Sequence, residues 1–272
     1  MDISRSAPQD FPRTAIVTGS DSGIGKATAV ALAEMGCDVG ITWHTDEHGA
    51  QATAEEVRAA GRRAQVRRLD LTTLPDAADV IDELAELLGG VDVLVNAAGT
   101  GGSAPLLDID YATWREVITT DLDGAFLCLQ RAARRMVAAG RGGRIVNITS
   151  VHEHQPRVGA ATYCAAKGGL GLLTRTAALE LSEHNITVNA VAPGEIATPM
   201  TGQQDINVHQ EHRPGVPLGR PGDAREVAAV VAFLCSAAAS YVTGASWAVD
   251  GGMLQMGPMA GSHLQAQDWR RP

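Results

Sequence analysis

Short apolar segments alternate with segments of helical periodicity along almost the whole chain. Several of the apolar segments are continuous runs of Val, Ile and Leu, which is typical of strands covered on both faces. This alternation predicts right-handed βαβ units and an α/β fold with one doubly wound parallel sheet of about seven strands and helices on both faces. The strands are expected at 14–18, 38–43, 64–69, 91–95, 144–148, 186–191 and 246–249.

The segments between these strands carry apolar residues at helical spacing. Clear examples are 25–36 and 76–90, and longer helices are expected at about 111–139 and 162–184. The stretch 195–219 is polar and weakly periodic. Because it is long for a loop, it predicts a lid over a binding site.

No linker rich in Pro, Gly or Ser divides the chain. Its 272 residues, 45% of them hydrophobic, can bury a core without disulfides or metals. The sequence therefore predicts a single domain over 1–272, with a core at about 14–252, an N-terminal arm at 1–13 and a C-terminal tail at 253–272.

The charge balance argues against a nucleic-acid partner. The formal net charge is −9 and the sequence pI is about 5.3, whereas a nucleic-acid binder carries a basic face. Two arginine-rich stretches, 61–69 and 131–144, are interpreted as a solvated strand edge and a solvated helix face.

Cysteine spacing and hydropathy indicate neither a metal site nor a membrane segment. No two of the four cysteines have CxxC spacing, so free thiols in a reducing compartment are expected. Residues 227–249 carry no formal charge and could span a bilayer by length, but Gly244 interrupts them. We interpret them as a buried helix, a turn and a strand. The N-terminus has no apolar signal core, so we expect a cytoplasmic protein without a membrane partner.

A glycine-rich turn joins the first strand to the first helix. Gly19, Gly23 and Gly25 would allow a phosphate to approach the start of that helix closely. A tight turn without a ligand is the alternative. A P-loop does not fit, because Ser20 stands where its first glycine belongs and Ala27 where a Ser or Thr should bind magnesium.

Lysine is rare in this chain, which makes one lysine informative. Of 22 Lys and Arg residues, the only two lysines are Lys26 and Lys167. Lys26 is interpreted as a solvated helix residue, whereas Lys167 follows Tyr163 by four residues on one helix face. A nearby ammonium favours the phenolate form of a phenol, and lysine is a more compact cation than arginine. The pair predicts an acid–base site, and the alternative is a surface lysine near a core tyrosine.

A series of short motifs accompanies the glycine turn and this pair. They are TGSDSGIG (18–25), Asp70, NAAG (96–99), NITS (147–150), YCAAK (163–167), PGEIAT (193–198) and DGG (250–252). In this order and spacing the chain, from about 14 to 252, resembles the short-chain dehydrogenase/reductase family of the classical type. The segments SVHE and YCAAKGG are also similar to bacterial glucose-dehydrogenase-like members of that family.

The resemblance implies a Rossmann-type NAD(P)-binding domain and a catalytic group. Tyr163 would be the general acid or base, and Lys167 would favour its ionised form and bind the nicotinamide ribose. Ser150, 13 residues before Tyr163, would hold the substrate oxygen. Asp121 stands where the family often has Asn. Since that Asn is thought to hold a relay water through its main-chain carbonyl, Asp121→Asn is expected to keep most activity and leave the pH profile almost unchanged.

The resemblance also implies a set of cofactor contacts, in which Asp70 would meet adenine and NAAG would line the cofactor floor. Ala98 replaces an Asn that is usual in the family, and this change is expected to cost little. The implied contacts are Gly19, Ser22, Gly23, Ile24, Gly25, Trp43, His44, Asp70, Leu71, Asn96, Ala97, Ala98, Gly99, Tyr163, Lys167, Pro193, Gly194, Ile196 and Thr198.

The end of the second strand bears on the choice of cofactor. An NAD-preferring site places an acidic residue there to hold the ribose 2′-hydroxyl, but this chain has Trp43 and His44. Asp46 and Glu47 come later and are expected to begin the next helix. We therefore expect NADP(H) to be favoured, with NAD(H) as the alternative.

Three functions are compatible with these features. The first is an NAD(P)-dependent oxidoreductase acting on a secondary alcohol or ketone; the others are a redox sensor on the same fold and an oligomeric scaffold. The intact group of Ser150, Tyr163 and Lys167 favours the enzyme. A sugar-like or dicarbonyl substrate is a hypothesis, and the family resemblance with the two long helices predicts a homotetramer. Residues that could face the substrate or could be polar loop residues are His152, Glu153, His154 and Arg157.

Overall fold

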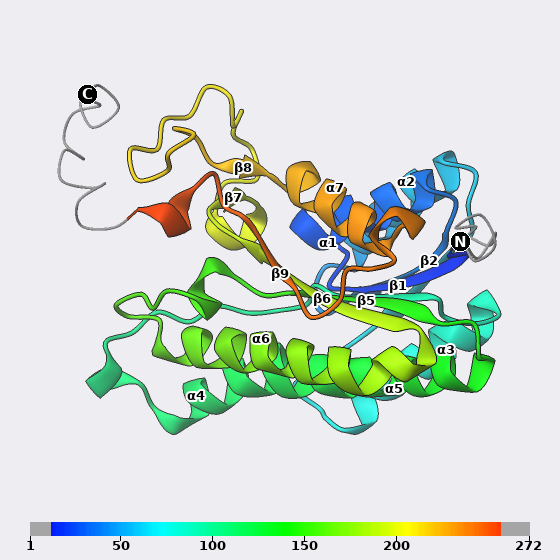
Figure 1. Ribbon diagram of the computed structural model, residues 1–272. Coiled ribbons are helices and arrows are strands. Elements are labelled where there is room, and N and C mark those ends of the chain that lie inside the picture. The colour runs from blue at the N-terminus through cyan, green and yellow to red at the C-terminus, as the bar shows by residue number, and fades with distance from the viewer. Residues whose placement is uncertain (1–11, 257–272) are drawn as a thin grey trace, which may run out of the picture.

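The computed structural model describes residues 12–256, and its centre is a seven-stranded sheet (Figure 1). All neighbouring strands pair in parallel in the order β3-β2-β1-β4-β5-β6-β9. The predicted fold class is confirmed. The strands are β1 (Thr14–Thr18), β2 (Asp38–Trp43), β3 (Ala64–Arg68), β4 (Val93–Asn96), β5 (Gly143–Ile148), β6 (Ile186–Pro193) and β9 (Ser246–Val249).

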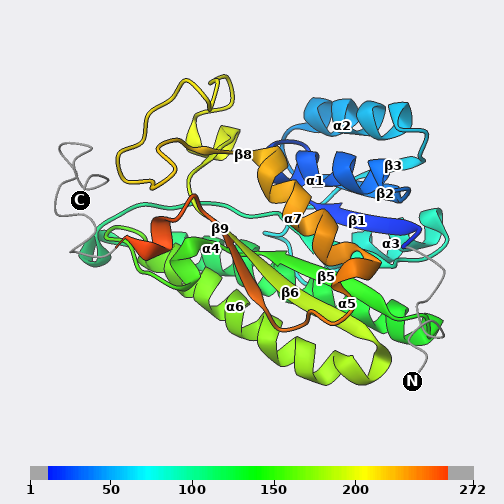
Figure 2. The same ribbon diagram turned by 45° about the horizontal axis from the view of Figure 1, so that its top comes forward.

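Helices cover both faces of this sheet, as Figures 1 and 2 show. One face carries α1 (Gly23–Glu34), α2 (Glu47–Ala59) and α7 (Ala224–Cys235). The other carries α3 (Asp79–Leu88), α4 (Tyr111–Ile118), α5 (Gly124–Ala139) and α6 (Ala161–Leu181). Short 3-10 helices are η2 (Asp76–Ala78), η3 (Leu106–Asp108), η5 (Val151–Glu153), η6 (Ser182–His184), η7 (Pro199–Thr201), η8 (Ala237–Ala239) and η9 (Met253–Gln255).

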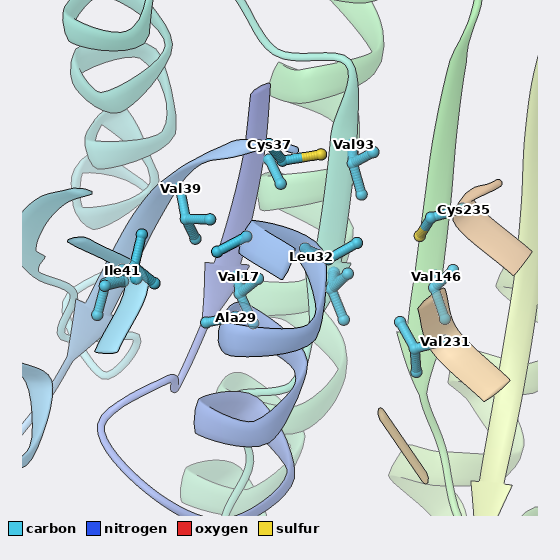
Figure 3. Close-up of a cluster of buried hydrophobic side chains, with 14 of the residues drawn as sticks. Val17, Ala29, Leu32, Cys37, Val39, Ile41, Val93, Val146, Val231 and Cys235 are labelled. Atoms are coloured by element: carbon cyan, nitrogen blue, oxygen red, sulfur yellow. The ribbon is translucent and has the colours of Figure 1, made fainter. Parts of the chain in front are cut away.

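The apolar strands are buried by the helices on both sides. On the α1 side, Val17 and Val146 pack with Leu32 of α1 and Val231 of α7 (Figure 3). The alternate strand residues, such as Ile16, pack against α3 and α5. Each central strand therefore needs apolar residues at successive positions, which explains the continuous Val, Ile and Leu runs.

Two features of the fold were not predicted. The expected long helix at 111–139 is interrupted by a π-helical turn, η4 (Thr119–Asp123), between α4 and α5. A two-stranded parallel ladder joins β7 (Ile196–Ala197) to β8 (Gly222–Asp223), so the ends of the expected lid are fixed to each other.

The uncharged stretch 227–249 forms the end of α7, a 3-10 turn and β9, as expected. Within residues 12–256, no helix is long and apolar enough to cross a membrane. Several arginines of the two arginine-rich stretches form ion pairs at the surface, such as Arg63 with Asp38 and Arg131 with Asp82. Most of the expected N-terminal arm and C-terminal tail, 1–11 and 257–272, lies outside the described residues.

Candidate active site

The carboxyl ends of the strands open onto one cavity of about 380 Å³. The strand order reverses between β1 and β4, and ligands of doubly wound sheets bind at such a switch point. The cavity brings together most of the predicted site residues. They are Gly19, Ser22, Gly23, Ile24, Gly25, Trp43, His44, Leu71, Ala97, Ala98, Gly99, Asp121, Ser150, Tyr163, Lys167, Pro193, Gly194, Ile196 and Thr198.

The turn between β1 and α1 has the tight backbone that its glycines predict. Gly19 has φ +60°, and a Cβ on Gly25 would lie 2.0 Å from the Gly19 carbonyl oxygen. Ser20, the residue that argued against a P-loop, is buried, and its hydroxyl accepts a hydrogen bond from Thr42 N at 3.1 Å. Ser20 therefore fastens the turn to β2.

The start of α1 forms part of the cavity wall. Its N-cap residue, Ser22, makes no side-chain cap hydrogen bond to the described chain. The first N–H groups of a helix attract anions when no side chain satisfies them. This wall therefore suits the pyrophosphate of a dinucleotide, and the close glycine packing leaves room for it.

Tyr163 and Lys167 share one face of α6, as their spacing predicts. Lys167 is only 4% exposed, and its Nζ lies 5.5 Å from the centre of the Tyr163 ring. Nζ also donates a hydrogen bond to the main-chain oxygen of Ile148 at 3.2 Å. Ser150 follows β5, and its Oγ accepts a hydrogen bond from His152 N at 3.1 Å. The Ser150 hydroxyl proton can therefore be donated to a ligand.

Asp121 adds a carboxylate to this group through contacts that the sequence did not predict. Its Oδ1 accepts a hydrogen bond from Thr100 N at 2.7 Å, and its Oδ2 lies 3.1 Å from Lys167 Nζ. Burial lowers the pKa of Lys167, but the neighbouring Asp121 carboxylate and Tyr163 side chain raise it by more, so it lies above its ordinary value. Lys167 is therefore an ammonium at neutral pH.

Charged side chains gather around Trp43 at the ends of β2 and β3. The His44 Nε2 lies 3.4 Å from an Asp70 carboxylate oxygen, and Arg68 Nη2 lies 3.1 Å from the other. The Arg68 guanidinium also lies 5.9 Å from the centre of the Trp43 ring. Both basic side chains, His44 and Arg68, thus lie against the Asp70 carboxylate.

Asp21 lines the same part of the cavity and was not predicted as a site residue. Burial raises its pKa and so does the Asp46 carboxylate, whereas its own backbone N–H and His44 act in the opposite direction. The prediction of cofactor choice took into account only Trp43 and His44 at the end of β2. It therefore missed this carboxylate near the expected position of the adenine ribose. The position of Asp21 inside the glycine motif was the available signal.

Two predicted cofactor contacts lie outside the cavity lining. Asp70 lies beside it, paired with His44 and Arg68. Asn96 is buried, and its Nδ2 donates hydrogen bonds to Ala125 O at 3.1 Å and to Asn147 Oδ1 at 2.9 Å. Asn96 therefore supports the cavity floor instead of forming its surface.

The four residues considered for substrate contact are not part of the lining. The His152 ring lies 6.2 Å from the Tyr163 ring, centre to centre, and Glu153 N donates a hydrogen bond to Ser150 O at 2.9 Å. Glu153 is turned towards His154, with 3.0 Å between Oε1 and Nε2, and Arg157 is exposed. Cavity-lining residues that the sequence did not single out include Thr100, Glu116, Met200 and Thr201.

Comparisons with known proteins show similarity over most of the chain. A family model described as enoyl-(acyl carrier protein) reductase matches residues 19–254. The chain is 54% identical to the uncharacterized oxidoreductase YohF of Escherichia coli K12 over 90% of this chain and 97% of that protein. Among solved structures, acetoin dehydrogenase YohF from Salmonella typhimurium matches with a TM-score of 0.88 and 53% identity, over 91% of this chain and 98% of that one. A structure from Agrobacterium tumefaciens with bound NADP matches with a TM-score of 0.77 and 32% identity, over 90% and 97%.

Proposed function

Because the chain belongs to the short-chain dehydrogenase/reductase family, and is therefore a nicotinamide-dependent oxidoreductase acting at CH–OH groups, we propose that Ser150, Tyr163 and Lys167 carry out its chemistry. The observation that carries this proposal is the buried Lys167 ammonium beside the Tyr163 ring in a cavity that Ser150 also lines. Such a group moves a proton between a phenol and a substrate oxygen.

The residues present fit a nicotinamide dinucleotide. The glycine turn and the start of α1 would hold its pyrophosphate, and Pro193, Gly194, Ile196 and Thr198 would flank its nicotinamide. When bound, the nicotinamide supplies the acceptor or donor of a hydride at its C4 atom.

The protein's own residues handle the substrate proton. In alcohol oxidation the Tyr163 phenolate takes the hydroxyl proton while the carbon loses its hydride, and reduction reverses both transfers. The Ser150 oxygen accepts a hydrogen bond from His152 N, and its O–H donates a hydrogen bond to the same substrate oxygen. The Lys167 ammonium stabilises the phenolate.

Turnover assays test this function and separate it from a redox sensor. Purified protein with a panel of secondary alcohols and ketones should oxidise or reduce the nicotinamide. Tyr163→Phe should retain cofactor binding and lose about 10²- to 10⁴-fold in kcat. Tight cofactor binding with no turnover on any panel member would favour the sensor.

For the substrate we propose a small α-hydroxy ketone or the related 1,2-dicarbonyl. The support is the 53% identity to a structure described as an acetoin dehydrogenase. Oxidation of the alcohol of an α-hydroxy ketone gives a 1,2-dicarbonyl, which agrees with the dicarbonyl hypothesis. Acetoin should give a higher kcat/KM than a simple secondary alcohol of equal carbon number, and equal values would overturn this substrate class.

For the cofactor we propose that NADP(H) is favoured and that NAD(H) is also accepted. His44 and Arg68 lie near the expected ribose position, and a relative at 32% identity has bound NADP. Asp21 opposes a 2′-phosphate, so the preference should be modest. Asp21→Asn should strengthen it at pH 6 and at pH 8. A preference for NADH at pH 6 and 8 would contradict the proposal.

We also propose a cytoplasmic homotetramer. The support for assembly is apolar exposure on two neighbouring helices, with Phe126 of α5 at 40%, Leu172 of α6 at 61% and Leu179 of α6 at 80%. The support for the location is that all four cysteines are free thiols. Light scattering should give four times the chain mass of 28.3 kDa at micromolar concentration. A particle of one chain would overturn the assembly.

A further inference from the structure

The Asp121 side chain occupies a fully enclosed position at the π turn. It has no exposed side-chain surface, and Thr100 N holds its Oδ1 at 2.7 Å. A Cβ on Gly99 would lie 3.1 Å from Asp121 Oδ2 and 3.3 Å from Lys167 Nζ. The backbone at Gly99 therefore packs against the ion pair, and almost none of either side chain is exposed.

The second carboxylate oxygen depends on Lys167 for its electrostatic partner. Oδ2 lies 3.1 Å from Nζ, and no described residue gives it a well-aligned hydrogen bond. Removing either charge would leave the other buried without compensation, which is costly in a low-dielectric site. The carboxylate and the ammonium thus form one unit.

The other charged groups around this unit are few. Glu116 of α4 lines the same cavity, whereas Arg115 of α4 is directed to Asp123 at 3.4 Å. His152 of η5 lies beside the Tyr163 ring. From α5, Arg131 and Arg135 pair with Asp82 of α3. The charges that meet at Tyr163 are therefore chiefly those of Lys167 and Asp121.

We propose that the Asp121 carboxylate is a positioning residue: it anchors the Lys167 ammonium and partly cancels its charge, so that Tyr163 ionises at a higher pH than it would with an amide at position 121. This inference rests on the proposed role of Tyr163 as the acid–base group. It replaces the expectation that the carboxylate takes no part, and it leaves the expected role of the main-chain carbonyl untested.

The sign of the effect follows from the charges. Asp121→Asn keeps an oxygen to accept from Thr100 N but removes one negative charge from the group. The unopposed ammonium then favours the phenolate more strongly. One unit charge at this range in a partly desolvated site moves an ionisation by about one pH unit or more.

The test uses the small number of tyrosines. The chain has three, and Tyr111 and Tyr241 are 75% and fully exposed. Ultraviolet difference titration of tyrosinate, corrected with Tyr163→Phe in each background, therefore isolates Tyr163. Asp121→Asn should move the Tyr163 midpoint down by about one pH unit, and the acid limb of alcohol oxidation should move with it.

The matched control is Asp123→Asn, two residues away, whose exposed carboxylate pairs with Arg115. This variant should leave the Tyr163 titration midpoint and the acid limb of alcohol oxidation unchanged. Circular dichroism should show the same fold in all variants. An unmoved or raised Tyr163 midpoint in Asp121→Asn overturns the inference. The titration needs no substrate, so it tests the inference separately from the proposed function. If the Tyr163 midpoint falls in Asp121→Asn but the parent protein shows no turnover, the inference is supported and the proposed function is contradicted.

Discussion

Two groups of ion pairs lie on the same side of the sheet in different surroundings. The pair of Lys167 and Asp121 is enclosed, with 6% and 0% of their side chains exposed. The arginines of α5 that hold Asp82 of α3 are about one third exposed, with 29% for Arg131 and 31% for Arg135. Both groups join elements far apart in the chain, but only the enclosed pair borders the cavity.

The comparison shows where the identity of a charged residue matters. Water can replace a lost partner in the α3–α5 network, so each pair there contributes little. The enclosed pair has almost no exposed side-chain surface, so a charge left alone there would be poorly solvated. Geometry is restricted too, because Asp121, Ile148 O and Tyr163 all surround one Nζ atom.

The largest effect is expected from Lys167→Arg. A guanidinium is wider than an ammonium and spreads its charge over a plane, so it cannot take the place of Nζ among its partners. Activity near pH 7 should fall by about 10²- to 10⁴-fold, while circular dichroism shows a folded protein.

The matched control is Lys26→Arg, the same exchange at the other lysine of the chain. Lys26 is 34% exposed and pairs with Glu56 across α1 and α2 at 2.8 Å. Steady-state kinetics of this variant should equal those of the parent protein. A near-normal kcat in Lys167→Arg would show that the enclosed pair tolerates replacement of lysine by arginine. The predicted difference between the enclosed pair and the surface network would then be wrong.

A smaller effect is expected from Asp82→Asn, which removes the shared acceptor of Arg131 and Arg135. Because these groups are partly solvated, the free energy of unfolding should fall by about 1 kcal/mol. Urea denaturation measures this change, and kcat/KM should stay constant. A loss of activity comparable to that of Lys167→Arg would mean that the network acts on the cavity.

The same network predicts a pH dependence of stability. Burial raises the pKa of Asp82, but the hydrogen bonds from Arg135 and Arg131 lower it by more, to below its ordinary 3.8. A lowered folded-state pKa gives stability that is present above the unfolded value and is lost as the pH falls through the folded value. The unfolding difference between the parent and Asp82→Asn should therefore shrink from pH 7 to about pH 3.5. If the difference in unfolding free energy between the parent and Asp82→Asn grows on acidification, the pKa of Asp82 is raised in the folded protein and the assigned direction is wrong.

The smallest effect is expected from Arg135→Lys, the reverse exchange in the exposed network. A lysine can keep one of the two contacts, to Asp82 or to Glu86, and water can solvate the other. Stability should change by about 0.5 kcal/mol or less. A change of several times that size would show that the network is more rigid than its exposure indicates.

The central strands could be predicted because both of their faces are buried. Each needed apolar residues at successive positions, and that signal is local to five or six residues, as in β1 and β2. The ladder of β7 with β8 left no such signal, since each strand has two residues. The π turn was also hidden, because its apolar spacing does not differ visibly from that of the helices on either side.

The candidate site could be predicted where the residues lie within one motif. Tyr163 and Lys167 are one helical turn apart, and their shared face follows from their spacing. The contact of Asp121 with Lys167 crosses 46 positions and depends on how η4 meets α6, so no spacing rule could reveal it. Asn96 was placed in the cavity wall because its motif borders the cavity, whereas its amide turns towards Asn147.

The π turn at Thr119–Asp123 also has a consequence for insertions and deletions. A π turn holds about one residue more than an ordinary helical turn, so removing one residue would restore a continuous helix with α4 and α5 oriented nearly as before. The apolar face of α5 with Cys128 and Met136 would still meet the sheet, but the widened turn that carries Asp121 to Lys167 would be lost. A functional descendant of this chain could therefore change length in the surface loops, but the π turn must keep its five residues.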